Sequence, residues 1–186
     1  MAAAVLALIM VLLLALPARA QLKDETLWVT VPAGYKIDFQ ARQGNALLTE
    51  MVPQAETVKN WTEMVTTQVF LGMKNVTPEQ FQALLKERWR ARCKDGEHAP
   101  IASGEENGYP FSVWLLTCPL NTMTGKPEHT WFKAIRGNDS FYVVQKAFGF
   151  APTQEQITEW VQFLRKIQVC DTRLADRPCP SAEKAK

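Results

Sequence analysis

The chain has 186 residues, 21 Lys and Arg against 19 Asp and Glu, and the apolar and charged content of an ordinary globular domain. This composition excludes collagen-like, disordered and multi-pass membrane proteins, and a net charge of +2 is too small to indicate a nucleic-acid-binding protein. The length allows one domain with a hydrophobic core, or at most two very small ones.

The first twenty residues have the pattern of a secretory signal. Residues 2–16 carry no charge, and Pro17 precedes the small residues Ala18 and Ala20 at positions −3 and −1 of a cleavage site. No Lys or Arg precedes the apolar run, so an uncleaved anchor is the alternative, because the run approaches the about 18 residues of a membrane span. Pro17 and the cleavage site favour removal. We therefore expect residues 1–20 to be a signal peptide and the protein to be periplasmic or secreted.

Four cysteines follow this signal: Cys93, Cys118, Cys170 and Cys179. An even number in an oxidising compartment favours two disulfides. We predict the pairs Cys93–Cys118 and Cys170–Cys179, because each joins the end of a predicted helix to a nearby later segment. A cysteine metal site requires close pairs such as C-x-x-C, which the sequence lacks. No cysteine is expected at a helix N-terminus, where a thiolate would be activated.

Strands are predicted in the first part of residues 21–170, which we assign to one α+β domain. Tyr35, Ile37 and Phe39 alternate with polar residues, as in a half-buried strand. Residues 62–70 fit a helix or a strand, and their threonines and valines favour a strand. The predicted strands are 27–31, 35–40, 46–52 and 62–70.

Two helices have clear start signals. Thr77 and Thr153 are predicted N-caps, and the glutamine three residues after each completes a capping box. Pro78 suits the first helical position. Apolar residues at helical spacing then predict one buried face on each helix. These residues are Phe81, Leu84, Leu85 and Trp89 in the first helix, and Ile157, Trp160, Val161, Leu164 and Ile167 in the second.

Between the helices the pattern again indicates strands. Residues 104–108 are expected to form a turn and residues 119–128 a loop. Strands are predicted at 109–118, 131–136 and 141–148. Short connections imply an antiparallel sheet packed with the two amphipathic helices, in the order strands, helix, strands, helix. Residues 171–186 are expected to be a polar C-terminal tail, with 181–186 frayed.

The element order, the V-P-A-G-Y turn at residues 31–35 and the N-W-T-E-M-V-T segment at 60–66 resemble the PsbP/DcrB-like α/β sandwich family of small exported bacterial proteins. The resemblance covers residues 27–170. It implies a non-enzymatic accessory or binding protein and supplies no functional motif to transfer.

The sequence shows no motif of a serine-hydrolase elbow, a zinc protease, a phosphate-binding loop or a dinucleotide-binding fold. We therefore predict no catalytic, cofactor-binding or metal-binding residues. His98 and His129 fall in or beside predicted loops, where a solvated histidine is expected; a pair of His129 with Cys118 is conceivable. Glu105 and Glu106 fall in a predicted turn, where acidic residues are usually solvated.

The first helix carries a basic face that we interpret as a solvated surface, since its charges spread around the helix. An anionic surface is the alternative partner for this face. Six tryptophans are many for this length. Trp114 alternates with Phe111, Val113 and Leu115, so it is expected on the opposite sheet face, either under a helix or available to a partner.

These features favour a binding or accessory factor for another protein or complex of the cell envelope, with an inhibitor or immunity-type protein as a sharper variant. No nucleic acid, no cofactor and at most peripheral membrane contact are expected. The alternative is a small envelope hydrolase that uses a loop histidine, which would need a Ser, Cys or Asp within hydrogen-bond reach. A third alternative is a structural subunit anchored by an uncleaved signal.

Overall fold

The computed structural model describes residues 24–180. The predicted signal peptide and the end of the tail, residues 181–186, lie outside the described residues. Along the described chain the elements are β1 (Glu25–Trp28), β2 (Tyr35–Gln43), β3 (Ala46–Pro53), β4 (Glu63–Leu71), α1 (Pro78–Arg92), β5 (His98–Glu106), β6 (Tyr109–Asn121), β7 (Lys126–Arg136), β8 (Ser140–Phe148), α2 (Gln154–Lys166) and β9 (Gln168–Asp171). No helix between residues 24 and 180 is both long enough and apolar enough to cross a membrane.

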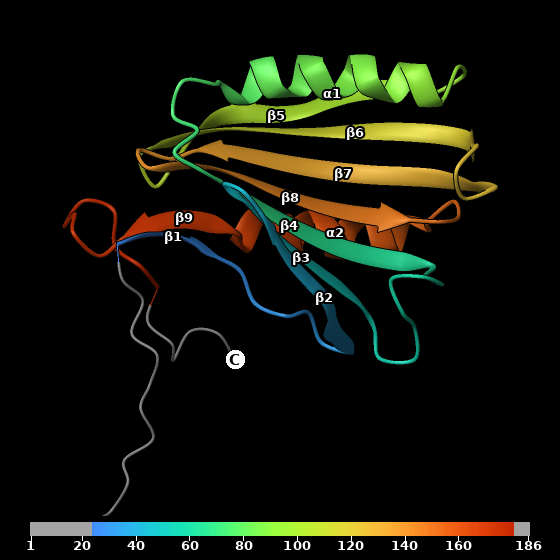
Figure 1. Cartoon of the computed structure of the whole chain (residues 1–186), viewed down its shortest axis with the longest axis horizontal. Helices are drawn as coiled ribbons and strands as arrows, with labels where there is room; N and C mark the ends of the chain where they lie inside the picture. Colours follow the sequence, from blue (N-terminus) through green and yellow to red (C-terminus); the bar gives the residue numbers. More distant parts are fainter. Residues whose placement is uncertain (1–23, 181–186) are drawn as a thin grey trace, which may run out of the picture.

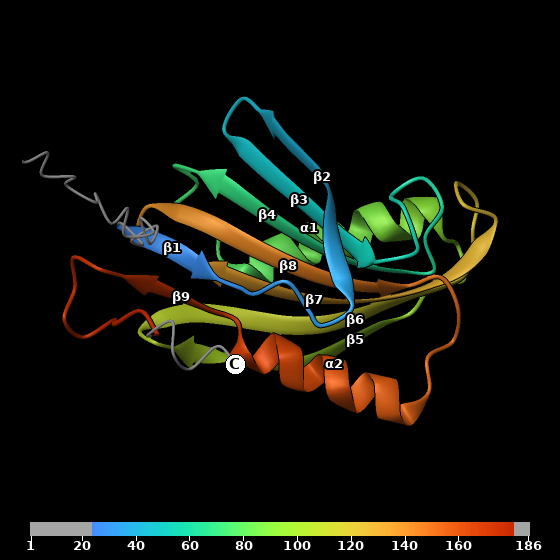
Figure 2. The same cartoon turned by 90° about the horizontal axis from the view of Figure 1, so that it is seen from below.

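Seven strands form one antiparallel sheet in the order β2-β3-β4-β8-β7-β6-β5. The pairing of β4 with β8 joins the strands that precede α1 to those that follow it. The two helices lie on opposite faces of the sheet (Figures 1 and 2). The predicted α+β class and the order of strands and helices are confirmed.

A hydrophobic core lies on each face of the sheet. On the α2 face, Trp160, Leu164 and Ile167 pack against the buried side chains of β4, β7 and β8. The small sheet of β1 and β9 extends this core, since Leu27 and Val169 contact Ile135 and Tyr142. On the α1 face, a second cluster forms from Trp114, Leu116, Phe132, Ala134, Phe141 and Val143.

Both predicted capping boxes are present. The Thr77 hydroxyl accepts a hydrogen bond from the Gln80 N–H, and the Gln80 side chain accepts one from the Thr77 N–H. Thr153 and Gln156 form the same reciprocal pair at α2. Each box satisfies two N–H groups that would otherwise lack a partner, so both helices begin where the sequence predicts.

Both predicted disulfides are also confirmed. Cys93 is the C-cap of α1 and bonds to Cys118 on β6, which ties the end of the helix to the sheet. Cys170 on β9 bonds to Cys179. Within the described residues no cysteine is free.

Three predicted connections are wrong in detail. The predicted turn at 104–108 is narrower, because β5 continues to Glu106 and only Asn107 and Gly108 have the positive φ of a tight turn. Most of the predicted loop at 119–128 is strand, since β6 ends at Asn121 and β7 begins at Lys126. Asp171 is the last residue of β9, so the strand extends into the predicted tail.

The small residues and proline of β5 explain why that strand has no alternating pattern. The strand forms nevertheless, because β5 pairs with β6.

Candidate functional site

A groove runs between α1 and the sheet. It has a volume of about 600 Å³, within the range of ligand pockets. Side chains of α1 form one wall, Phe132 and the hydrogen-bonded pair Gln68 and Gln145 lie on the sheet side, and the Cys93–Cys118 disulfide is at one end. We call this the α1 groove. Its lining residues are Gln68, Phe70, Met73, Val76, Phe81, Leu84, Leu85, Arg88, Trp89, Arg92, Cys93, Cys118, Asn121, Glu128, Phe132 and Gln145.

The groove exists because α1 does not seal against the sheet. Phe81, Leu85 and Trp89 are only half-buried, and Leu84 is 48% exposed, so the prediction of a buried face is wrong for Leu84. The only α1 residue that is fully buried is Pro78. The Trp89 indole N–H donates to the Thr117 carbonyl, which fixes the ring at the groove wall.

The charges of the groove are unevenly partnered. Arg88 and Arg92 are exposed and lie one helical turn apart on the groove side. Neither forms an ion pair with any residue between 24 and 180. Arg90 lines no part of the groove and pairs with Glu87. Glu128 accepts hydrogen bonds from Asn121 at 2.5 Å and Thr130 at 2.9 Å, so its oxygens already have partners.

The opposite face holds two buried lysines that the sequence analysis did not single out. The Lys146 ammonium donates to Glu63 at 2.5 Å and Tyr35 at 2.7 Å, and lies 3.7 Å from the centre of the Trp160 ring. Burial lowers the pKa of Lys146 to about 8, although Glu63 opposes the shift. Its place among the inward residues of β8, next to Val144 and Phe148, is the sequence signal that marks it.

The second buried lysine, Lys133, bonds to carbonyls at the C-terminal end of α2. Lys133 donates to the carbonyls of Leu164 at 3.1 Å and Ile167 at 2.5 Å, and it pairs with Glu106. A cation at these carbonyls suits the helix dipole. Burial lowers the pKa of Lys133. Lys133 therefore ties the end of α2 to the sheet, whereas Lys146 bonds to β2 and β4 and contacts α2 only through the Trp160 ring.

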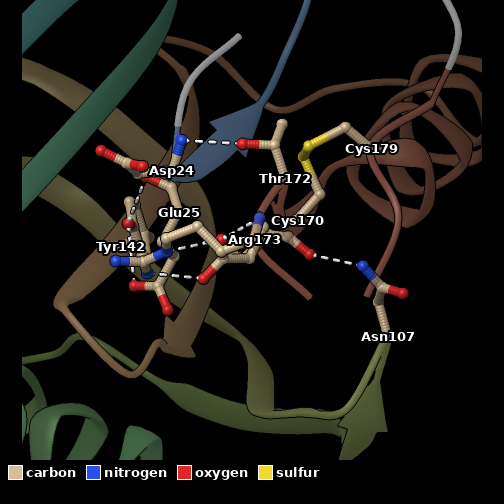
Figure 3. Close-up of a disulfide and its surroundings, with 10 residues drawn as sticks. Asp24, Glu25, Asn107, Tyr142, Cys170, Thr172, Arg173 and Cys179 are labelled. Atoms are coloured by element: carbon tan, nitrogen blue, oxygen red, sulfur yellow. Dashed lines mark hydrogen bonds and ion pairs between the residues drawn. A yellow bond between two sulfur atoms is a disulfide. The ribbon is translucent and has the colours of Figure 1, made fainter. Parts of the chain in front are cut away.

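A cluster of carboxylates lies near the second disulfide (Figure 3). Oxygens of Glu25, Asp139 and Asp171 lie within 4.8 Å of one another, which would suit a cation. Each carboxylate already has donors, however. Glu25 accepts from the Tyr142 hydroxyl and three backbone N–H groups of the β7–β8 turn. Arg173 bridges the two aspartates. The cluster therefore links β1, the β7–β8 turn and the C-terminal segment through hydrogen bonds and ion pairs.

The two edge strands of the seven-stranded sheet, β2 and β5, differ in their protection. In β2, residues 39–43 are all exposed, and Ile37 and Phe39 are exposed by 47% and 42%. In β5, Pro100 removes an N–H donor. Each edge ladder has one register shift, between Ile37 and Phe39 in β2 and between Pro100 and Ala102 in β5. We call β2, with Ile37 and Phe39, the β2 edge.

Both histidines lie in strands and not in loops, so that prediction is wrong. His98 begins β5, is half-buried, and its Nε2 lies 2.7 Å from the Gln82 amide nitrogen. His129 is half-buried in β7. Burial lowers the pKa of both imidazoles, and Lys86 and Arg90 lower that of His98 further. Within residues 24–180 neither ring bonds to a Ser, Cys or Asp side chain. Cys118 is in a disulfide and offers no thiol to His129.

Glu105 and Glu106 end β5, so their predicted place in a turn is also wrong. Of the tryptophans, Trp114 is fully buried under the α1 face and stacks on Phe132 with ring centres 5.2 Å apart. Trp131 and Trp160 are buried in the other core. Trp114 therefore offers no surface to a partner.

Comparison with protein families finds no match, and comparison with curated proteins finds none either. Among solved structures, the chain is similar to LpqN, which is involved in cell envelope biogenesis of Mycobacterium tuberculosis. The two share 8% sequence identity and a TM-score of 0.41, over 81% of this chain and 86% of that chain. The resemblance to the PsbP/DcrB-like family stays a prediction. The two disulfides are compatible with an extracytoplasmic protein.

Proposed function

We propose that the protein is an exported, non-enzymatic accessory factor of the cell envelope that binds another envelope protein through the β2 edge. The partner contributes an extended segment that pairs with β2 as an additional strand. The predicted signal sequence and the two disulfides support export. An inhibitor or immunity-type role is one form that such binding can take.

The observation that carries this proposal is the exposed stretch of β2. An edge strand offers a row of unpaired N–H and C=O groups that another strand can complete. Proteins usually protect such edges, and β5 has a proline that β2 lacks, while both edges carry one register shift. On β2 the side chains of Ile37 and Phe39 remain exposed, Phe39 on the face of Glu50 and Ile37 on that of Met51. Apolar side chains on both faces of the strand can contact a partner on either side.

Crosslinking of the protein lacking residues 1–20 in its own envelope extract tests this proposal. The variant Ile37→Lys/Phe39→Lys places two charges on the β2 edge. The matched control is Ile101→Lys on β5, whose side chain is 46% exposed. We expect mass spectrometry to recover the same partner with the unmodified chain and the control, and at least about tenfold less with the double variant, since losing two apolar contacts costs 1.4 kcal/mol or more.

Equal recovery of the partner with the double variant would exclude the β2 edge as the binding site. Recovery of no partner with the unmodified chain would count against the binding function itself. Far-UV circular dichroism of the variants checks that the exposed substitutions leave the fold intact.

A further inference from the structure

We propose that the α1 groove binds a dissolved amphiphile with one apolar chain and an anionic head group. No β2 residue lines this groove, and the proposed site does not depend on the proposed protein partner. Apolar and charged side chains are unevenly distributed along α1.

The apolar lining is concentrated around the first half of α1. Phe81, Leu84 and Leu85 come from the helix, and Phe70, Met73 and Val76 from the segment before it. The rings of Phe70 and Phe81 lie 5.9 Å apart, and Phe81 also contacts Phe141, which fixes this end of the groove. The exposed Leu84 has no described partner that covers it, so an apolar chain here would remove its surface from water.

The cationic lining is at the second half of the same helix. Arg88 and Arg92 lie on one side of α1, and no carboxylate within residues 24–180 forms an ion pair with either. Glu128 is the one carboxylate among the described lining residues, and its oxygens accept hydrogen bonds from Asn121 and Thr130. These neutral donors do not cancel the charge of Glu128, so two arginines and one glutamate leave the groove lining with a formal charge of +1, which favours an anion. Guanidinium groups suit planar carboxylates in particular.

The two halves together define the ligand. The 15 residues of α1 extend over about 22 Å, and the groove's volume of about 600 Å³ suits one small ligand. A single chain can therefore lie along the helix with its tail near Phe81 and its head near Arg92. Between the two ends, the hydrogen-bonded Gln68 and Gln145 and the ring of Trp89 line the groove.

Isothermal titration calorimetry with dodecanoate below its micelle concentration tests the site on the protein without residues 1–20. We expect saturable binding of one molecule, with dodecanol and acetate at least about tenfold weaker because each lacks one half of the ligand. Arg88→Gln/Arg92→Gln should weaken dodecanoate binding at least about tenfold, while Arg90→Gln on the same helix should change it less than about twofold.

A second pair of variants probes the apolar half. Leu84→Asp should lose at least about tenfold in affinity, while Ala83→Asp, exposed on α1 and outside the groove lining, should not. Equal binding of dodecanol, no saturable binding of dodecanoate, or insensitivity to both groove variants would overturn the proposal. So would binding to phosphatidylglycerol vesicles without binding of dodecanoate, which would indicate a membrane surface. The Ile37→Lys/Phe39→Lys variant should retain dodecanoate affinity, which separates this site from the β2 edge.

Discussion

The two faces of the sheet are covered by helices of similar length and with the same capping box, yet α2 packs more tightly on the sheet than α1. On the α2 face, Trp160, Leu164 and Ile167 are exposed by no more than 7%. On the α1 face, the corresponding stripe is half-buried and borders the groove. Capping therefore decides where each helix starts, while the side chains facing the sheet decide whether it seals.

The two faces also differ in whether their cations are buried and have partners. The cations under α2, Lys133 and Lys146, are buried and bonded to carboxylates, a hydroxyl and helix carbonyls. The cations beside α1, Arg88 and Arg92, are exposed and have no acidic partner within the described chain. The charges under α2 have partners within the fold, although burial makes the charge of Lys146 costly at neutral pH, and the charges on α1 are left for a ligand.

The largest expected effect comes from removing one leucine on each face. Leu164→Ala on α2 removes a side chain that is 2% exposed, and should lower the free energy of unfolding by about 2–5 kcal/mol. Leu84→Ala on α1, where the leucine is 48% exposed, should lower it by about 1 kcal/mol or less. Urea unfolding of both variants measures the difference. Equal losses would show that α1 seals the sheet as α2 does.

Sequence patterns predicted the elements whose signals are local. Thr77 and Thr153 mark their helices because capping boxes need only four residues, and alternation marks the strand at residues 109–118. The sequence patterns did not predict β5 and β9. β9 forms by pairing with β1, which is distant in the chain, and β5 forms by pairing with β6, whose pattern is clearer. For the cysteines, the even count and the helix ends sufficed to choose the correct pairs.

The candidate site was harder to predict, because it depends on how tightly a helix packs. Phe81, Leu84, Leu85 and Trp89 form an apolar stripe, although α1 as a whole is more polar and more weakly amphipathic than α2. Whether such a stripe is buried depends on its distance from the sheet, which no periodicity contains. The same limit applies to Arg88, whose place beside an open groove is invisible in the spacing of charges around the helix.

A smaller effect should appear in the pH dependence of stability, through Lys146. Its pKa is about 8 in the folded protein, below the ordinary value of 10.5, so the folded state binds fewer protons between these pH values. Stability should therefore rise with pH, by about 2 kcal/mol between pH 7 and 9.5. Glu63, Glu56 and Glu159 oppose the shift. Burial also raises the pKa of the neighbouring Tyr35, whose effect begins above its unfolded value of 10.0.

Urea unfolding at several pH values measures this rise, and Lys146→Met should lack the part that Lys146 contributes. Lys133 has a lowered pKa as well and acts in the same direction in both proteins. A rise that is equal in the two proteins would show that Lys146 titrates normally in the folded state. The matching substitution on the other face, Arg90→Gln, should leave the rise between pH 7 and 9.5 unchanged, because Arg90 is exposed and the nearby His98 titrates below this range.

The smallest effect on stability is expected for Arg88→Gln/Arg92→Gln, with a change below about 0.5 kcal/mol at either sign. Like charges one turn apart repel by about 0.2–0.5 kcal/mol, while Arg92 in the last turn gains a similar amount from the helix dipole, so the two contributions nearly cancel. Thermal and urea unfolding of the double variant measure the balance. A loss above about 1.5 kcal/mol would mean that the arginines hold α1 in place, as Lys133 holds α2, and the contrast between the two faces would fail.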